Sequence, residues 1–393
     1  MTKMQYKISI DSWDDLEKKS IIDVINSGQY SMGKKVKLFE QKFAKFLGSK
    51  YSVMVNSGSS ANLIGVAAQF FLKKNKLKRG DEVIVPAIGW STTYSPLQQF
   101  DLKLKIVDIS LKDLNIDIDL LKKAITKKTK MICAVNLSGM PSNSIEIKKL
   151  CKKNKIIFYE DNCESLGSKI IKKRTGSFGD FGTHSFFFSH HMSTIEGGMV
   201  ATDSFELYNI LKCIRAHGWT RDLSKNSHLF KNNKKDEEFT GQYNFILPGF
   251  NVRPTEINAS IGITQLKKID KMIKLRRQNL SLFENLFAND NRFIIPKSPY
   301  FNSSFAFPLI LKPEFSKLRS NIFKMLKKNN IEFRLIAGGC FTKHPAKEYY
   351  NFEIYKNDIK NAEFVHSNGF WIGNYGKDLN NEIRFLYSLI KKI

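Results

Sequence analysis

The chain has 393 residues, 42% of them hydrophobic and 25% charged, a composition that excludes a disordered protein and allows one to three globular domains. Lys and Arg number 63 against 37 Asp and Glu, and the net charge of +26 would by itself favour a nucleic-acid or membrane partner. The surplus is spread as short lysine runs without a nucleic-acid-binding motif, so we expect a solvated lysine-rich surface and no nucleic-acid partner.

Neither a membrane span nor a metal site is indicated. No stretch approaches the roughly 18 uninterrupted apolar residues of a transmembrane helix, and the N-terminus lacks the apolar region of a signal peptide. We therefore expect a cytoplasmic protein with no membrane partner. The five cysteines are widely spaced and include no C-x-x-C pair, so we predict no metal, no disulfide framework and no iron–sulfur cluster.

In chain order, the first predicted elements are two amphipathic helices, about 13–26 and 35–46. Short apolar runs then alternate with helical patterns as far as residue 200, which is typical of a mostly parallel sheet with helices on both faces. The predicted strands are 51–56, 82–86, 104–109, 130–136, 156–160, 183–187 and 198–202. The predicted helices between them include 60–71, 116–125 and 145–151.

The second half of the chain has a different pattern. The polar Lys/Asn-rich stretch 222–245 is predicted to be a long loop, and a long helix follows at 254–287. The remainder mixes short strands and helices. We expect a large α/β domain over 1–253, including the N-terminal helices, and a small C-terminal α+β domain over 254–393, entered by the long helix.

Two nucleotide-binding motifs can be dismissed. The segment from Gly28 to Lys35 is close to a P-loop, but Lys35 replaces the Ser or Thr that would hold magnesium, and the segment follows a helix instead of a strand. No G-x-G-x-x-G follows a strand. A P-loop enzyme and a Rossmann dehydrogenase are both disfavoured.

A serine-rich segment, NSGSSAN at 56–62, lies between a predicted strand and a predicted helix. Free backbone N–H groups and the hydroxyls of Ser59 and Ser60 would form a phosphate seat at the positive end of the helix dipole. The alternative is a plain helix N-cap, in which Ser59 or Ser60 satisfies the first turn.

Two further segments follow predicted strands. Trp90 follows the strand 82–86, where its ring either stacks on a planar ligand or packs in the core. Glu160 and Asp161 end the strand 156–160, where an acid either holds the proton of a pyridine ring or caps a loop.

These segments, together with SFFFSHHMSTIEGG at 185–198, resemble the DegT/DnrJ/EryC1/StrS sugar aminotransferase family of fold-type I pyridoxal-phosphate enzymes. The likeness extends to Gly28–Gly33 with Phe39 and Glu40, and to GFNVRPTE at 249–256 followed by GITQL at 262–266. It implies an aspartate aminotransferase-like α/β fold, in which helices flank a mostly parallel seven-stranded sheet and a smaller α+β domain follows.

By position, the resemblance implies that Ser59, Ser60 and Ser185 bind the phosphate of pyridoxal 5′-phosphate. Asn251 would reach the phosphate of the neighbouring subunit, which implies a homodimer with shared active sites.

The resemblance also assigns the groups around the cofactor ring. Trp90 would stack on the ring, Asp161 would pair with the pyridine nitrogen, and Glu164 would lie near the ring hydroxyl. An ionised Asp keeps the pyridine protonated, and a protonated ring is the better electron sink.

The chain departs from the family at His190, which stands where an aminotransferase has its Schiff-base lysine. Two hypotheses follow: a non-catalytic binding or regulatory protein, or an enzyme that deprotonates without a covalent lysine link. The family's sugar 3-dehydratases carry His at this position and use pyridoxamine 5′-phosphate. This chain resembles them in EDNCES at 160–165, AHGWTR at 216–221 and NGFWIGN at 368–374.

This second likeness implies a lyase that removes the 3-hydroxyl of a nucleotide-linked 4-keto-6-deoxyhexose, above all GDP-4-keto-6-deoxy-D-mannose. L-Glutamate would donate the amine, and the product would enter 3,6-dideoxysugar synthesis for surface polysaccharide. A branch with a [2Fe–2S] cluster holds it with clustered cysteines, which are absent here, because Cys213 is the only cysteine between Cys163 and Cys340. The intact set of predicted cofactor residues argues against a non-catalytic protein.

Four other residues are candidates for lesser roles. His191 points away from its neighbour in an extended segment, so the pair makes a poor metal site, and we expect His191 to pack or hydrogen-bond nearby. His217, Arg221 and Arg334 either bind substrate or form structural ion pairs and hydrogen bonds.

Overall fold

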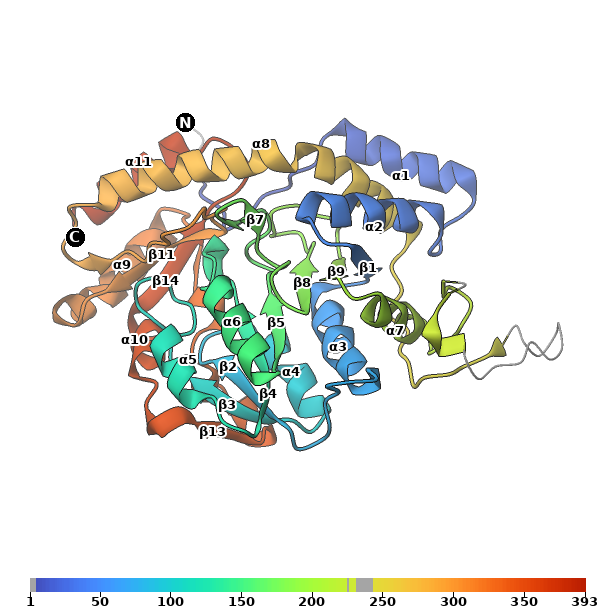
Figure 1. Cartoon of the computed structure of the whole chain (residues 1–393). Helices are drawn as coiled ribbons and strands as arrows, with labels where there is room; N and C mark the ends of the chain where they lie inside the picture. The colour runs from blue at the N-terminus through green and yellow to red at the C-terminus, as the bar shows by residue number, and fades with distance from the viewer. Residues whose placement is uncertain (1–4, 225, 231–242) are drawn as a thin grey trace.

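The computed structural model describes residues 5–224, 226–230 and 243–393, and a large sheet lies at its centre (Figure 1). The order of its strands in space is β1 (Tyr51–Val55), β9 (Gly198–Thr202), β8 (Phe181–Ser185), β5 (Ile157–Asp161), β4 (Thr129–Val135), β2 (Glu82–Pro86), β3 (Lys103–Val107) and β13 (Phe352–Ile354). In this sheet β9 is antiparallel to both of its neighbours, and all other adjacent pairs are parallel. The predicted mostly parallel α/β sheet is confirmed.

All seven predicted strands are present, with ends displaced by at most two residues, but the sheet has an eighth strand, so the count of seven is wrong. The additional strand, β13, comes from the C-terminal part of the chain and pairs with β3 at the edge of the sheet. A lysine of β3, Lys103, also forms an ion pair of 2.6 Å with Glu353. Three half-buried residues carry too little hydrophobic pattern to predict such a strand.

Helices cover both faces of the sheet because its buried strands present apolar side chains on each side. The helices that pack on one face are α3 (Gly58–Ala68), α4 (Ser91–Gln99) and α7 (Phe205–Arg215). The helices that pack on the other face are α2 (Lys34–Leu47), α5 (Ile118–Ala124), α6 (Ser144–Asn154) and α8 (Glu256–Phe287). The alternation is visible in β2, where Val83 and Val85 join the first core and Ile84 joins the second.

The long helix α8 links the large sheet to a second, four-stranded sheet, and it confirms the predicted helix at 254–287. In Figure 1 it runs from α1 (Asp15–Ser27) and α2 to α11 (Asn380–Ile390). The second sheet has the order β10 (Phe293–Ile294), β11 (Ala306–Leu311), β14 (Gly369–Gly373) and β12 (Phe333–Arg334). The other elements are α9 (Arg319–Lys328), α10 (Lys360–Asn368) and the hairpin β6 (Lys169–Ile170) and β7 (Lys173–Arg174).

Of the predicted loop 222–245, residues 225 and 231–242 lie outside the described part of the chain. The glycines of the false P-loop have structural roles instead. Gly28 ends α1 with φ +67°, and Gly33 precedes α2. The Glu256 carboxylate accepts hydrogen bonds from the N–H groups of Gly33, Lys35 and Val36, which fixes the start of α2 against α8.

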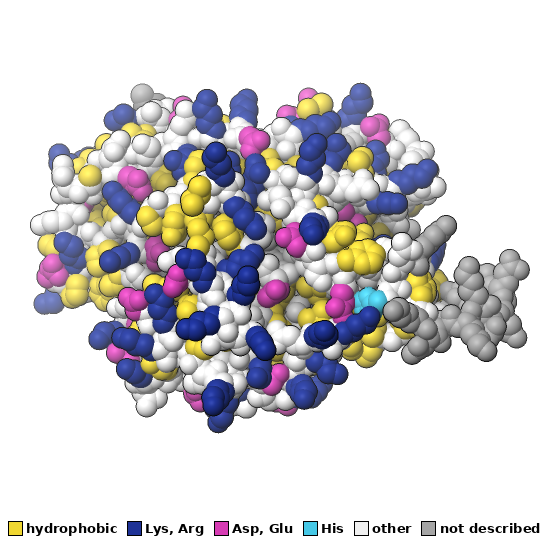
Figure 2. Space-filling model, viewed as in Figure 1, with side chains coloured by type: hydrophobic (Ala, Val, Ile, Leu, Met, Phe, Trp, Pro, Cys, Tyr) yellow, Lys and Arg dark blue, Asp and Glu magenta, His cyan; other side chains and the backbone are white. Residues whose placement is uncertain are grey.

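The surface charge is dispersed. Figure 2 shows Lys and Arg side chains spread over the visible face, with Asp and Glu between them. None of the helices described in this structure combines the length and the hydrophobicity that crossing a bilayer requires.

A buried ion pair supports β1 from outside the sheet. Arg215 Nη1 lies 2.6 Å from Glu40 Oε1, and both also bond the backbone of Met54. Glu40→Ala would leave a buried guanidinium without its counter-charge, so we expect a loss of about 3–5 kcal/mol in the free energy of unfolding. Urea denaturation monitored by fluorescence measures this. Lys343→Ala, which breaks an exposed pair with Glu363, should leave the midpoint unchanged, and equal losses in the two variants would contradict the prediction.

Candidate active site

The predicted cofactor residues gather at one edge of the large sheet. Because β1, β2, β5 and β8 run in the same direction, the residues that follow them meet at their shared carboxyl edge. Ser57 follows β1, Trp90 follows β2, and Asp161 and Ser185 end β5 and β8. Ligands of open α/β sheets bind at this edge.

The serine-rich segment forms the start of α3. Ser57 is the N-cap, and its hydroxyl oxygen accepts from the Ser60 N–H at 3.0 Å, so the capping serine is neither Ser59 nor Ser60. A Cβ on Gly58 would lie 2.5 Å from the Ser185 Cβ, so glycine allows the helix start to approach β8. Ser59, Ser60 and Ser185 are thereby grouped around a helix N-terminus, the arrangement that suits a phosphate.

The two acids at the end of β5 have different surroundings. Glu160 is fully buried and accepts hydrogen bonds from the N–H groups of Gly176, Phe178 and Gly179, so it holds a loop in place. Asp161 accepts from the Thr93 hydroxyl at 2.7 Å and from the Asn62 amide at 3.1 Å. Of the two acids, Asp161 is therefore the one that contacts α3 and α4 at the carboxyl edge of the sheet, called the cofactor edge below.

Those partners connect Asp161 to the other predicted residues. Thr93 and Thr92 lie in the first turn of α4, directly after Trp90, and the Ser59 hydroxyl donates to the Thr92 hydroxyl at 2.9 Å. Ser59 and Asp161 were predicted from the sequence, but Asn62 and Thr93, the groups that orient the acid, were not. Both lie near the N-termini of helices that follow strands, Asn62 in α3 and Thr93 in α4.

Trp90 is 56% exposed, so it does not belong to the core, and its ring is free to stack on a ligand. A Cβ built on Gly338 would lie 3.8 Å from the Trp90 ring, so the loop before Cys340 lies against the indole.

Removing the indole is expected to weaken cofactor binding. Stacking on an aromatic ring contributes about 0.5–1.5 kcal/mol, so Trp90→Ala should raise the dissociation constant of pyridoxal 5′-phosphate about tenfold, and Trp90→Phe should raise it less. Absorbance titration measures both. As a control, Phe205→Ala changes an aromatic beside Tyr51 at the opposite edge of the sheet, and an equal effect there would contradict the assignment of Trp90.

Glu164 follows Asp161 in a half-buried position, and its Oε2 accepts from the Ser138 N–H at 2.9 Å. Burial raises the pKa of Glu164 to about 8 against this opposing hydrogen bond, and the Asp161 charge adds to the rise. A carboxyl group that is protonated at neutral pH is able to donate a hydrogen bond to an oxygen on a ligand.

His190 lies in the loop between β8 and β9, and its ring centroid is 5.2 Å from that of Phe305. Its Nδ1 is buried without a hydrogen-bond partner in the described protein. Burial and, after it, the charge of Arg276 lower the pKa of His190 to about 4, against the opposing effect of a hydrogen bond with the Cys163 backbone. The imidazole is therefore neutral at physiological pH and able to accept a proton.

His191 has a structural setting. Its Nε2 lies 2.9 Å from the Ser303 hydroxyl, and the side chain is buried. Within the ranges that the structure describes, no three His, Cys, Asp or Glu side chains are arranged to hold a metal ion. The expectation that His191 hydrogen-bonds nearby is confirmed. The expected extended segment at these two histidines is wrong, because they lie in a bend and both imidazole rings lie near the Phe305 ring.

The remaining predicted residues lie apart from this cluster of contacts. Asn251 is exposed, and its side-chain oxygen accepts a hydrogen bond from the Arg253 Nε at 3.1 Å. The carbonyl of the next residue, Val252, accepts from the Asn56 N–H. His217 is exposed beside it, with φ +64° and its N–H bonded to the Phe250 carbonyl.

Arg221 and Arg334 are also exposed. The Arg221 guanidinium stacks over the Trp219 ring at 5.2 Å, and Arg334 lies on β12. Within the described part of the chain, neither these arginines nor His217 form an ion pair, so the structural ion pairs considered as alternatives are absent there. Roles in substrate binding stay predictions.

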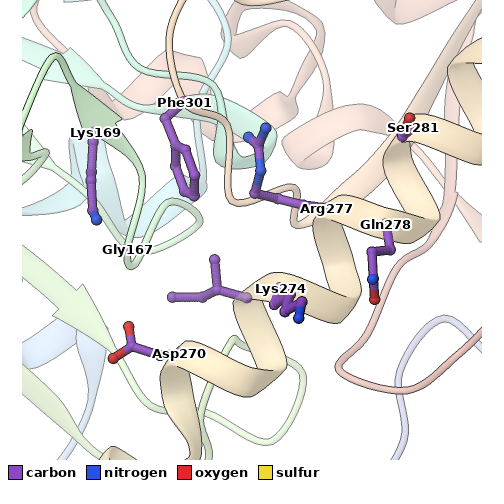
Figure 3. Close-up of a pocket in the computed structure, with 9 residues that line it drawn as sticks. Gly167, Lys169, Asp270, Lys274, Arg277, Gln278, Ser281 and Phe301 are labelled. Carbon is purple, nitrogen blue, oxygen red and sulfur yellow. The ribbon is translucent and has the colours of Figure 1, made fainter.

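A separate cavity of about 380 Å³ lies between α8 and the β6–β7 hairpin (Figure 3). Its lining residues are Gly167, Lys169, Asp270, Ile273, Lys274, Arg277, Gln278, Ser281 and Phe301. In Figure 3, Lys169 and Arg277 lie on either side of the Phe301 ring, and none of the predicted cofactor residues lines this cavity.

The fold and this site define the class of protein. Residues 11–384 match the model of the DegT/DnrJ/EryC1/StrS aminotransferase family, and the chain belongs to that family. It is 46% identical to the GDP-4-keto-6-deoxy-D-mannose 3-dehydratase of Yersinia pseudotuberculosis, over 99% of each chain.

Two solved structures of GDP-4-keto-6-deoxymannose-3-dehydratase are similar throughout, each with a TM-score of 0.95 and 45% identity over 98% of this chain and 100% of the other. One is a histidine-to-asparagine mutant with bound GDP-perosamine, and the other contains a trapped PLP-glutamate geminal diamine.

Proposed function

We propose that this chain is a lyase that uses pyridoxal and pyridoxamine 5′-phosphate to remove the 3-hydroxyl of GDP-4-keto-6-deoxy-D-mannose, with L-glutamate as the amine donor. The observation that carries the proposal is His190, a neutral imidazole where the family's aminotransferases have a lysine, beside an otherwise intact cofactor edge. The similar dehydratases with a bound GDP-sugar and with a PLP–glutamate adduct support the same substrate and donor.

The residues present fit the cofactor. The serines at the start of α3 and Ser185 offer hydroxyl and N–H groups to a phosphate, and Gly58 keeps that space open by its close approach to Ser185. Asp161, held by Asn62 and Thr93, suits a protonated ring nitrogen, and the exposed Trp90 suits a ring face.

When bound as pyridoxamine phosphate, the cofactor supplies an amine for the sugar's 4-keto group and a ring that accepts electrons. Asp161 holds the ring nitrogen in its protonated form. His190 accepts a proton on its neutral imidazole, and this transfer permits expulsion of the 3-hydroxyl. Because position 190 is not a lysine, no side-chain amine there competes for the cofactor.

The assembly and the location belong to the same proposal. Asn251 is exposed and precedes Val252, whose carbonyl accepts from Asn56 beside the serine-rich start of α3. This is the position expected of a residue that completes the site of a second subunit, and we propose a homodimer with shared active sites. Nucleotide sugars and glutamate are cytoplasmic metabolites, so we propose a cytoplasmic enzyme that serves dideoxysugar synthesis for surface polysaccharide.

The first test is spectroscopic. The purified protein is mixed with pyridoxal 5′-phosphate and then with excess L-glutamate, and the visible absorbance is followed. We expect conversion to the pyridoxamine form and no lysine adduct after borohydride treatment. Binding without conversion would favour the non-catalytic alternative, and failure to bind would contradict both.

A further inference from the structure

Arg276 is a buried cation of α8 that contacts the loop of His190. The side chain is 2% exposed, and its Nη2 donates to the His190 carbonyl at 3.3 Å. Its Nη1 donates to the carbonyls of Ser304 and Phe305, each at 3.3 Å, and to that of Asn374. Four carbonyl groups thus surround the guanidinium, and among the described residues no carboxylate lies within ion-pair distance of it.

A buried charge of this kind lowers the stability of the folded protein. Burial lowers the pKa of Arg276 to about 9, so it still carries its charge at neutral pH, and its Nε has no partner in the described protein. A buried charge without a counter-ion destabilises the folded state, and an apolar side chain would fill the same space without this penalty. Packing alone therefore does not explain an arginine here.

The contacts of Arg276 join three segments that border the predicted site. Ser304 and Phe305 lead into β11, Asn374 follows β14, and His190 lies in the loop after β8. The Phe305 ring also lies against the imidazole, and the backbone N–H of Phe305 donates to the Ser138 carbonyl at 3.1 Å. The guanidinium thus ties the His190 loop to the C-terminal sheet.

We propose that Arg276 is a positioning residue for proton transfer: its guanidinium fixes the His190 loop against β11 and β14 and places a positive charge beside the imidazole. This inference rests on the proposed function, in which His190 is the base.

Electrostatics supports this assignment. Among the described residues, the charged and titratable groups that face His190 are Arg276 from α8 and His191 from its own loop. The segment after β5 reaches it through the Cys163 backbone, and the segment before β11 through the uncharged Phe305 ring. After burial, the Arg276 charge is the largest cause that lowers the pKa of His190, so removing that charge must raise the pKa towards neutrality.

Three variants of the holoenzyme test the proposal by the pH profile of kcat/KM and by NMR titration of the histidines. Arg276→Gln should move the acid limb and the His190 titration upward by about one pH unit, because the imidazole loses a facing charge. Arg276→Lys keeps the charge but not the planar fork, so the limb should stay in place while kcat falls about tenfold at unchanged KM. Arg277→Gln, the neighbouring control that bonds the Asn302 carbonyl, should move neither.

A purely structural role predicts a different result. Arg276→Gln would then lower the melting temperature but keep the wild-type pH profile and His190 titration, and this would overturn the proposal. The NMR titration requires no turnover, so it decides the matter even if the wild-type protein fails to dehydrate the ketosugar, which would contradict the proposed function alone.

Discussion

His190→Asn is expected to lower the rate of dehydration by at least about 10³-fold, because the amide cannot accept the proton that the neutral imidazole takes. The cofactor edge formed by α3, α4 and β5 does not include His190, so the affinity for pyridoxamine phosphate should change little. Turnover measured by ammonia release, together with a cofactor titration, checks both parts.

The neighbouring histidine provides the matched control. His191→Asn removes the contact with Ser303 and should lower stability more than turnover. His190→Lys should also lose dehydration, and borohydride should now trap a covalent link between the cofactor and the new amine. Equal loss of turnover in the two asparagine variants, with both folded, would contradict the assignment of His190 as the base.

Asp161→Asn is expected to lower turnover by at least about 10²-fold and to weaken cofactor binding. The amide retains the shape of the carboxylate near Thr93 and Asn62 but removes the charge that would keep a ring nitrogen protonated. Single-turnover kinetics with saturating cofactor separates the two effects.

Glu160→Gln is the control for this prediction, since the two acids are adjacent in β5. Glu160 accepts backbone hydrogen bonds from the loop at 176–179, so its variant should lose stability and keep turnover per folded molecule. A stable, active Asp161→Asn protein would contradict the role given to Asp161.

Much of the fold was predictable because the strands of a parallel sheet are buried on both faces and appear as short apolar runs. All seven such strands were found, and so was the long helix at 254–287. The three-residue edge strand β13 was missed, because it is half-buried and gains its place by pairing with β3. The division into domains at residue 254 stays a prediction.

The site was predictable only in part. A serine-rich turn after a strand left both a phosphate seat and a plain helix N-cap open, and the roles of the serines, Trp90 and Asp161 depended on the family resemblance. Contacts between distant segments were invisible in the sequence, such as the hydrogen bond from Thr93 to Asp161 and the four carbonyls around Arg276. Arg276 stands in the run LRRQN, where nothing distinguishes it from the half-exposed Arg277.

The most direct test of the central claim is product analysis after incubation with GDP-4-keto-6-deoxy-D-mannose, L-glutamate and pyridoxal 5′-phosphate. Mass spectrometry of the nucleotide sugar is combined with an ammonia assay. We expect a 3-deoxy-4-ketosugar and one ammonia for each sugar converted, because the amine is lost after the 3-hydroxyl leaves. A GDP-linked 4-amino sugar that retains its 3-hydroxyl, formed without ammonia, would contradict it.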